Sequence, residues 1–394
     1  MKKAIALFIS AGMLLSPVSA SALSAEQAEG YAEGIVSFEK NKNHISDSDS
    51  LLSGDIAERA GNDNADWLAI GAVRAGLEDR TGEYYTHWKK NINDKYTHDG
   101  GLDRDKATEW HRAVLTAQCL GADPANLSGI DLLNDGVYSR GDDKPLGKQG
   151  LNGWVWALIA VDSCDWKFPD NAKVTRLDLI NTILYSQNAD GGFSIAPTDG
   201  RSDPDITAMT LQALAPYRGC QEAKEVTTAA VDYLAVKQSD FDSCETVSQV
   251  ICALCCLGID PDEDARFSTL TDELISYAND DGGFAHTKDG LSNEMASAQA
   301  LIAFCSIERL RSGERQVYDM NAGMAEPVTE TVLITAANRK ERNTTLPNTD
   351  ELRPWSVKHY DKETKIAIVA MILAIGVVTV AAGIFLRNRK ERSK

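Results

Sequence analysis

Basic residues are in short supply in this chain of 394 residues. Lysine and arginine together number 40, against 58 aspartates and glutamates, and the formal net charge is −18. A surface this acidic repels phosphate backbones and anionic lipid head groups. We therefore expect no nucleic-acid partner, and solubility outside the cell is the plain explanation of the charge.

Partners for a metal site are also lacking around the cysteines. Cys252, Cys255 and Cys256 share one helical face, but no histidine or carboxylate lies beside them at ligand spacing. Cys119 and Cys305, like these three, fall inside apolar helical patterns rather than in loops. A disulfide framework remains the alternative for an exported chain. We expect most of the eight thiols to be small core residues.

The two ends of the chain carry an export signal and an anchor. Residues 1–22 have two lysines, an apolar stretch and the triplet Ala20-Ser21-Ala22, the order of a cleaved signal peptide. Residues 366–386 carry no charge, over a length close to the roughly 20 residues that cross a bilayer as a helix. The alternative for residues 1–22 is an uncleaved membrane anchor, and the alternative for residues 366–386 is a buried core helix.

A basic tail, residues 387–394, follows the apolar run and predicts a cytoplasmic C-terminus. The protein is therefore expected in the cell membrane as a single-pass type I protein, with the lipid bilayer as a partner through 366–386. Residues 322–365 lose all periodicity and gain Thr, Asn, Pro and charge, which predicts a stalk.

Between these ends, one tripeptide recurs at a fixed interval of 91 residues. Asp-Gly-Gly stands at 99–101, 190–192 and 281–283, and weaker copies at Asp135 and Asp240 halve the interval to about 45 residues. A fixed period of this length is the signature of a repeat architecture, and a unit of this size is a helical hairpin.

Each unit has an amphipathic outer helix, a Gly-rich turn and an inner helix that is apolar nearly all round. The inner helices are expected to begin near Trp67, Trp110, Trp154, Asp205, Thr246 and Glu294. The outer helices are expected at 25–39, 83–93, 124–133, 174–186, 222–236 and 265–278. Six hairpins predict an all-α fold, an (α/α)6 toroid over residues 23–321, whose inner helices run parallel and join their N-terminal ends at one mouth.

One copy of the repeat carries a family resemblance. Gln187-Asn188-Ala189-Asp190-Gly191-Gly192-Phe193 resembles the Q-x-x-D-G-x-[FW] repeat of the prenyltransferase, squalene-cyclase and cobalamin-binder superfamily. The similarity covers roughly residues 25–321 and is closest over 184–320, where it resembles exported bacterial members. This resemblance implies an (α/α)6 toroid, a fold that hosts both enzymes and binding proteins.

The candidate site is expected at the mouth of the toroid. Aligning the inner helices on Gln212, Gln249 and Gln299 makes Asp205, Asp242 and Ser292 equivalent, with Thr207, Cys244 and Glu294 two positions on. Tryptophans at the helix starts, among them Trp67 and Trp156, would give aromatic walls suited to a large apolar ligand. The candidate ligand-binding residues are Trp110, Trp154, Asp205, Thr207, Asp242 and Glu294.

Two short motifs at the mouth resemble catalytic ones. Asp203-Pro204-Asp205-Ile206-Thr207-Ala208 is similar to the D-x-D-D-T-A motif of terpene cyclases, which implies that Asp205 protonates a carbon–carbon double bond. Ile206 replaces the neighbouring carboxylate of that motif. The alternative is that Asp203 or Asp205 caps the helix.

Asp242-Ser243-Cys244 is similar to the D-x-C zinc pair of protein prenyltransferase β subunits. The histidine that completes that site is missing, which leaves His286 or Glu294 as the remaining ligand. Zinc is therefore not expected, and capping with a buried thiol is the alternative.

These observations predict a surface-anchored toroid that binds a bulky apolar or tetrapyrrole-like ligand, an isoprenoid or a corrinoid, in its central cavity. The alternative is a terpene cyclase or prenyltransferase-type enzyme with Asp205 as general acid. A third hypothesis is an interaction module that uses the outer face. No cofactor is required by the sequence, and a corrinoid enters as a ligand.

Overall fold

Helices make up nearly all the regular structure of the residues that the computed structural model describes, which are 22–78, 80–196 and 201–321. Strand pairing in these ranges is limited to four isolated bridges, so the prediction of an all-α fold is confirmed. No helix in these ranges is long and apolar enough to cross a membrane. The expected signal peptide (except residue 22), stalk, membrane span and basic tail lie outside the described residues.

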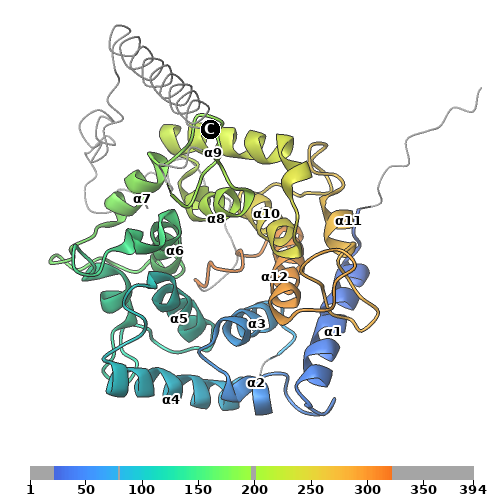
Figure 1. Ribbon diagram of the computed structural model, residues 1–394, viewed down its shortest axis with the longest axis horizontal. Helices are drawn as coiled ribbons and strands as arrows, with labels where there is room; N and C mark the ends of the chain where they lie inside the picture. The colour runs from blue at the N-terminus through green and yellow to red at the C-terminus, as the bar shows by residue number, and fades with distance from the viewer. Residues whose placement is uncertain (1–21, 79, 197–200, 322–394) are drawn as a thin grey trace, which may run out of the picture. The chain divides into compact units, whose positions relative to one another are not determined.

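Six helices lie around a common centre (Figure 1). They are α3 (Asp63–Arg74), α5 (Ala107–Cys119), α6 (Leu151–Asp162), α8 (Pro204–Leu214), α10 (Cys244–Cys256) and α12 (Glu294–Arg311). Each packs against the next in this order, and α12 packs against α3, so the succession closes on itself. These inner helices are buried on most of their surface because both their neighbours and the outer helices cover them; in α10 every residue from Thr246 to Cys255 is buried.

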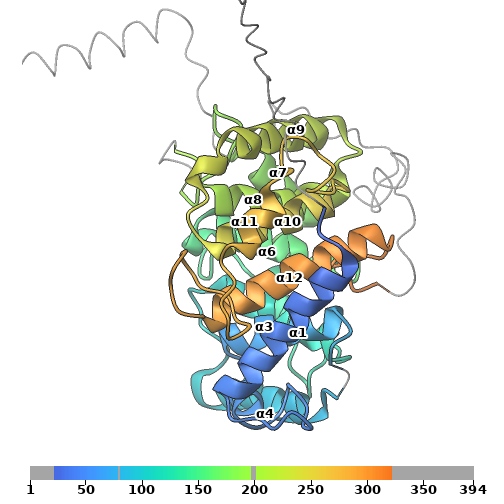
Figure 2. The same ribbon diagram turned by 90° about the vertical axis from the view of Figure 1, so that its right-hand side faces the viewer.

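Outer helices cover the inner ones. They are α1 (Ala25–Lys42), α4 (Gly82–Asp99), α7 (Arg176–Leu184), α9 (Gln221–Val236) and α11 (Leu270–Ile275). In α1, Ala28, Ala32, Ile35 and Phe38 form a single buried stripe at the spacing of an amphipathic helix. Figure 2 shows α1 lying against α12, so the first and last helices of this part of the chain are neighbours.

Neighbouring inner helices run in the same direction. Near their N-terminal ends, Asp66 of α3 accepts a hydrogen bond from Arg112 of α5. Near their C-terminal ends, Gln118 of α5 bonds Ser163 at the end of α6. The N-terminal ends therefore gather at one side, called the N-terminal mouth below, and the C-terminal ends gather at the other.

One expected outer helix does not form. Residues 124–133 are a turn closed by a bridge between Leu127 and Ile130, followed by a π-helical turn, η1 (Asn134–Tyr138). Ser128 and Gly129 both have positive φ, 55° and 88°, which no right-handed helix tolerates. A short helix that the sequence did not predict, α2 (Gly54–Glu58), packs on α4.

The Asp-Gly-Gly copies make the same turn twice. Asp190 Oδ1 accepts hydrogen bonds from Gly192 N at 3.1 Å and Ser202 Oγ at 2.6 Å, and Asp281 does the same with Gly283 and Ser292. The middle residue of the second turn, Gly282, has φ +85° and lies against the backbone of α1. A methyl group there would be 2.5 Å from the carbonyl oxygen of Gly34.

We expect Gly282→Ala to destabilise the fold by about 3 kcal/mol or more, and Gly100→Ala by about 1–2 kcal/mol. Both glycines have positive φ, but an added methyl at Gly100 meets nothing within 4 Å. The difference between the variants therefore isolates the clash with α1. Thermal unfolding followed by circular dichroism measures it, and equal losses for the two variants would refute the close approach.

Candidate functional site

The N-terminal mouth is organised by helix caps. Asp203 caps α8 by accepting from Ile206 N at 3.0 Å, Ser243 caps α10 by accepting from Thr246 N at 3.1 Å, and Asn293 caps α12. Capping by Asp203, the alternative to an acid motif, is thus confirmed for that residue.

These caps correct the expected alignment of the inner helices. Asp205, Glu245 and Met295 each stand two residues after a cap, so Asp205 is equivalent to neither Asp242 nor Ser292. The expected alignment is wrong for α8 by three residues, nearly one turn, but it holds between α10 and α12, where Asp242 and Ser292 each directly precede the cap. The glutamines do meet, since Gln212 Nε2 donates to Gln249 Oε1 at 2.7 Å, but Gln212 lies one turn deeper than its partner.

Asp205 and Thr207, both expected ligand-binding residues, have different surroundings. Thr207 is fully buried, and its hydroxyl bonds Phe193 N at 2.9 Å and Asp203 O at 2.7 Å, which fixes the turn before α8. Asp205 is partly buried, and its Oδ1 has no hydrogen-bond partner among the described residues. Burial raises the pKa of Asp205 to about 6, against a lowering by the Thr246 hydroxyl.

The side chains of the zinc hypothesis do not form a ligand set, although Cys244 N donates to the carbonyl oxygen of His286 at 3.0 Å. Asp242 is exposed, whereas the Cys244 thiol is fully buried against Ser248 and the carbonyl of Ala296. Burial raises the pKa of Cys244, away from the thiolate that a metal requires. His286 instead pairs with Glu245 at 2.8 Å. Within the described ranges, no three His, Cys, Asp or Glu side chains are grouped to hold a metal.

Glu294 belongs to an ion-pair cluster beside α1. It lies 2.9 Å from Arg59 and 3.9 Å from Lys42. Burial acts to raise its pKa, but the hydrogen bond and charge of Arg59 outweigh burial, so the pKa of Glu294 is lowered. Glu39 beneath it is 1% exposed, and burial, then the charge of Glu294, raises its pKa to about 8.

Trp110 and Trp154 pack against glycine-containing turns. Trp110 is 3% exposed, donates to Asp103 O at 3.0 Å and lies against Gly101, and Trp154 lies over Gly147. Two other tryptophans, Trp67 of α3 and Trp156 of α6, line the space between the inner helices, and their ring centroids are 5.1 Å apart.

The chain after α12 turns back into the space that the six inner helices surround (Figure 1). Tyr318 packs edge-on against Trp67 and Trp156, with ring centroids 6.1 and 5.5 Å away. Arg74 donates to the carbonyl oxygens of Arg315, Gln316 and Asp319. This central segment, residues 313–321, has no apolar periodicity from which its position could be predicted.

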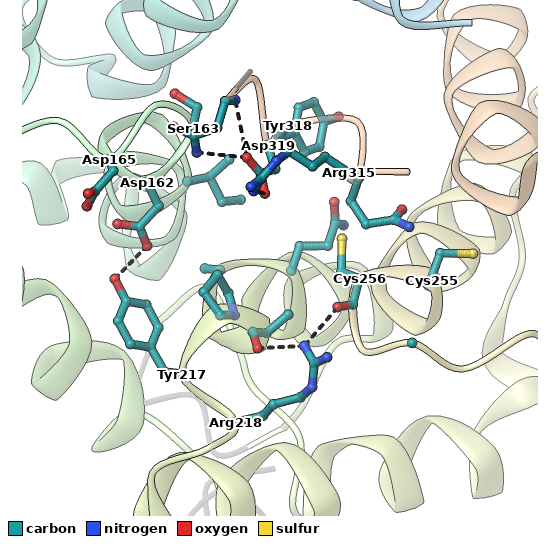
Figure 3. A pocket seen from close by; sticks show the side chains of 18 of the residues that line it. Asp162, Ser163, Asp165, Tyr217, Arg218, Cys255, Cys256, Arg315, Tyr318 and Asp319 are labelled. Carbon is teal, nitrogen blue, oxygen red and sulfur yellow. Dashed lines mark hydrogen bonds and ion pairs between the residues drawn. The ribbon is translucent and has the colours of Figure 1, made fainter. Parts of the chain in front are cut away.

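A cavity of about 470 Å³ lies at the C-terminal ends of the inner helices (Figure 3). This volume is within the roughly 300–1,000 Å³ typical of small-molecule sites. The ends of α6, α8, α10 and α12 and the central segment form its walls. Its apolar lining includes Ile159, Ala213, Ala215, Pro216, Leu310 and Tyr318. None of the six predicted ligand-binding residues lines it.

Several residues that line the cavity have a buried polar atom without a hydrogen bond. Among the described residues, Arg176 Nε, Gln212 Oε1, Arg315 Nε and Gln316 Oε1 are buried without a hydrogen bond. Arg176 Nε still lies 2.9 Å from Asp162 as an ion pair. Buried polar groups are normally satisfied by protein, water or ligand; atoms of this kind also occur away from the cavity, at Glu39 and His111.

Comparisons with known proteins give no family for this chain. No protein-family model matches it, and neither a curated protein nor a solved structure is significantly similar to it. The candidate site therefore rests on geometry alone.

The Glu39 cluster predicts an unusual pH dependence of stability. Between pH 4.5, its ordinary pKa, and about 8, Glu39 holds a proton in the folded protein that the unfolded chain has lost. The free energy of unfolding therefore rises as pH falls from 8 toward 4.5. Above pH 8, where Glu39 is ionised in the folded protein, the full cost of burying its charge is present. Glu39→Gln should raise Tm at pH 8 by about 2–4 °C or more and flatten this dependence.

Glu294→Gln is the matched control, because the pKa of Glu294 is shifted down whereas that of Glu39 is shifted up. Glu294 stabilises the folded state when ionised, so this variant should lower Tm at pH 8. Tm measured across pH 5–9 gives both results. A loss of stability at pH 8 in Glu39→Gln would contradict the buried, protonated state of Glu39.

Tyr318→Ala should destabilise the protein by about 3 kcal/mol and loosen the central segment, because it removes the ring that packs against Trp67 and Trp156 and leaves a cavity there. Tyr318→Phe keeps the ring and should be nearly neutral. Denaturant unfolding and the tryptophan emission maximum measure both changes. An unshifted emission and an unchanged stability in Tyr318→Ala would show that the ring does not fill the centre.

Proposed function

We propose that the closed succession of inner helices and its outer helices form an (α/α)6 toroid, and that this toroid is exported and anchored in the cell membrane. The packing of α12 on α3 supports the first statement. The charge and apolar pattern of residues 1–22 and 366–394 supports the second.

We propose that the toroid binds an apolar small molecule of isoprenoid size in the cavity at its C-terminal ends. The observation that carries this proposal is a cavity of about 470 Å³ whose walls combine apolar side chains with a few polar ones. Sites of this kind combine apolar walls with a few polar groups that orient the ligand. A corrinoid is disfavoured because the central segment occupies the space that so broad a ligand needs.

A second candidate function is general-acid catalysis by Asp205. The unpartnered Oδ1 and the pKa of about 6 favour it, since a carboxyl that keeps its proton is the acid such chemistry needs. Asp205 lies at the N-terminal mouth, however, at the opposite end of α8 from the cavity. Ile206 also stands where the resembled motif has a carboxylate.

The binding proposal is tested with the full chain in phosphatidylcholine nanodiscs. Native mass spectrometry of protein purified from its source should show a bound apolar molecule, and equilibrium dialysis should show uptake of all-trans-farnesol. Ala213→Leu narrows the cavity and should weaken farnesol binding about tenfold, since overfilling a packed space costs about 1–3 kcal/mol. Asp205→Asn should leave binding unchanged.

Two results would decide against the proposal. One is the absence of both a co-purifying molecule and farnesol uptake in the unmodified chain. The other is turnover of squalene or farnesyl diphosphate that Asp205→Asn abolishes, which would transfer the function to the N-terminal mouth. Circular dichroism shows whether each variant folds.

A further inference from the structure

Arg218 stands at the edge of the cavity, just after the short 3-10 helix η3 (Ala215–Tyr217) that extends α8. Its Nη1 donates to the carbonyl oxygens of Ala215 at 3.0 Å and Cys256 at 3.3 Å (Figure 3). These bonds hold the guanidinium across the C-terminal ends of α8 and α10. A guanidinium has five N–H donors, and Nε and Nη2 of Arg218 have no acceptor in the described part of the chain.

The other arginines that line the cavity are neutralised. Arg176 pairs with Asp162 at 2.9 Å and Asp165 at 3.7 Å, and Arg315 pairs with Asp319 at 2.8 Å. No carboxylate of the described residues lies within ion-pair distance of Arg218. Among the arginines that line the cavity, Arg218 is thus the one without an ion-pair partner in the described residues, and it is partly buried. Burial lowers the pKa of Arg218 accordingly.

The carboxylates at the cavity limit what can balance this charge. Asp162, Asp165, Glu314 and Asp319 all line the cavity, and Glu314 is itself paired with Arg309 at 2.9 Å. These four carboxylates already pair with Arg176, Arg309 and Arg315, so a ligand group with several negative charges, such as a diphosphate, would find one arginine left to balance it. A single negative charge matches the single unpaired cation.

Resting on the proposed function, we propose that the ligand is an apolar molecule with one terminal carboxylate, and that Arg218 binds this carboxylate through Nε and Nη2. The fork of a guanidinium pairs with the two oxygens of a carboxylate in a bidentate, charge-assisted contact. The apolar body then lies along Ile159, Ala213 and Leu310. The carboxylate fixes the orientation of a ligand whose remaining contacts are non-directional.

The test compares two probes of the same length, all-trans-farnesoic acid and all-trans-farnesol, on the full chain in phosphatidylcholine nanodiscs by equilibrium dialysis at pH 7.5. The unmodified chain should bind the acid at least tenfold more tightly than the alcohol. In Arg218→Gln the side-chain amide still donates to a helix carbonyl, but the charge is gone. Its affinity for the acid should fall to that for farnesol, while farnesol binding is unchanged.

Arg266→Gln is the control for loss of a positive charge, because Arg266 lies on the outer face, paired with Asp232 and Asp264, and it should alter neither affinity. Arg218→Lys keeps the charge without the fork and should retain part of the preference for the acid. This second variant keeps the test decisive if Arg218→Gln fails to fold.

Equal binding of acid and alcohol by the unmodified chain would overturn the assignment to Arg218 while leaving the cavity as a binding site. Tighter binding of farnesyl monophosphate than of farnesoic acid would overturn the proposal that the ligand carries a single carboxylate. Binding of none of the three probes would remove the proposed function itself, and this inference with it.

Discussion

The packing of α12 against α3 is the contact on which the rest of the structure depends. Gly71 lies so close to Leu301 and Ile302 that a methyl group there would be 3.2 Å from their side chains. At the C-terminal end of the same contact, Arg309 donates to the carbonyl oxygen of Arg74 at 2.9 Å. An array of helical hairpins normally leaves two apolar ends that need capping repeats. Closure removes both ends, because each terminal hairpin buries the apolar face of the other.

Closure also creates a problem at the centre. Helices that pack side by side around a closed succession enclose a space that their own side chains must fill, and an unfilled apolar space costs stability. Trp67 and Trp156 fill part of this central space. Tyr318, on a segment that belongs to no hairpin, fills a further part by packing against both rings. The cavity at the C-terminal ends is the part of the space that this segment leaves open.

Local chemistry made much of the fold predictable. The Asp-Gly-Gly turns, the inner-helix starts and the cap at Asp203 follow from residues that act within a few positions of one another. The failures have longer-range causes. Glutamine side chains span a helical turn, so Gln212 and Gln249 met although their helices were misaligned. The central segment is placed by Arg74 and two tryptophans that lie far away in sequence, and no periodicity could reveal that.

The parallel inner helices bring their acidic first turns to one side and their C-terminal carbonyl oxygens to the other. A helix N-terminus favours negative groups and a C-terminus favours positive ones, and running the helices in one direction adds these preferences together. Carboxylates accordingly stand in the first turns of α3, α5, α8, α10 and α12.

At the opposite side, arginines donate to the carbonyl oxygens where these helices end. Arg309 does so at α3, Arg176 at α6, and Arg218 at α8 and α10. Arg309 and Arg176 are ion-paired there with Glu314, Asp162 and Asp165, and Arg218 has no carboxylate within ion-pair distance among the described residues. The N-terminal mouth, the side that the sequence motifs indicate, has carboxylates of its own, and Arg59 and Arg112 pair with some of them. The helix ends that hold Arg218 in place through Nη1 leave its Nε and Nη2 without an acceptor in the described part of the chain.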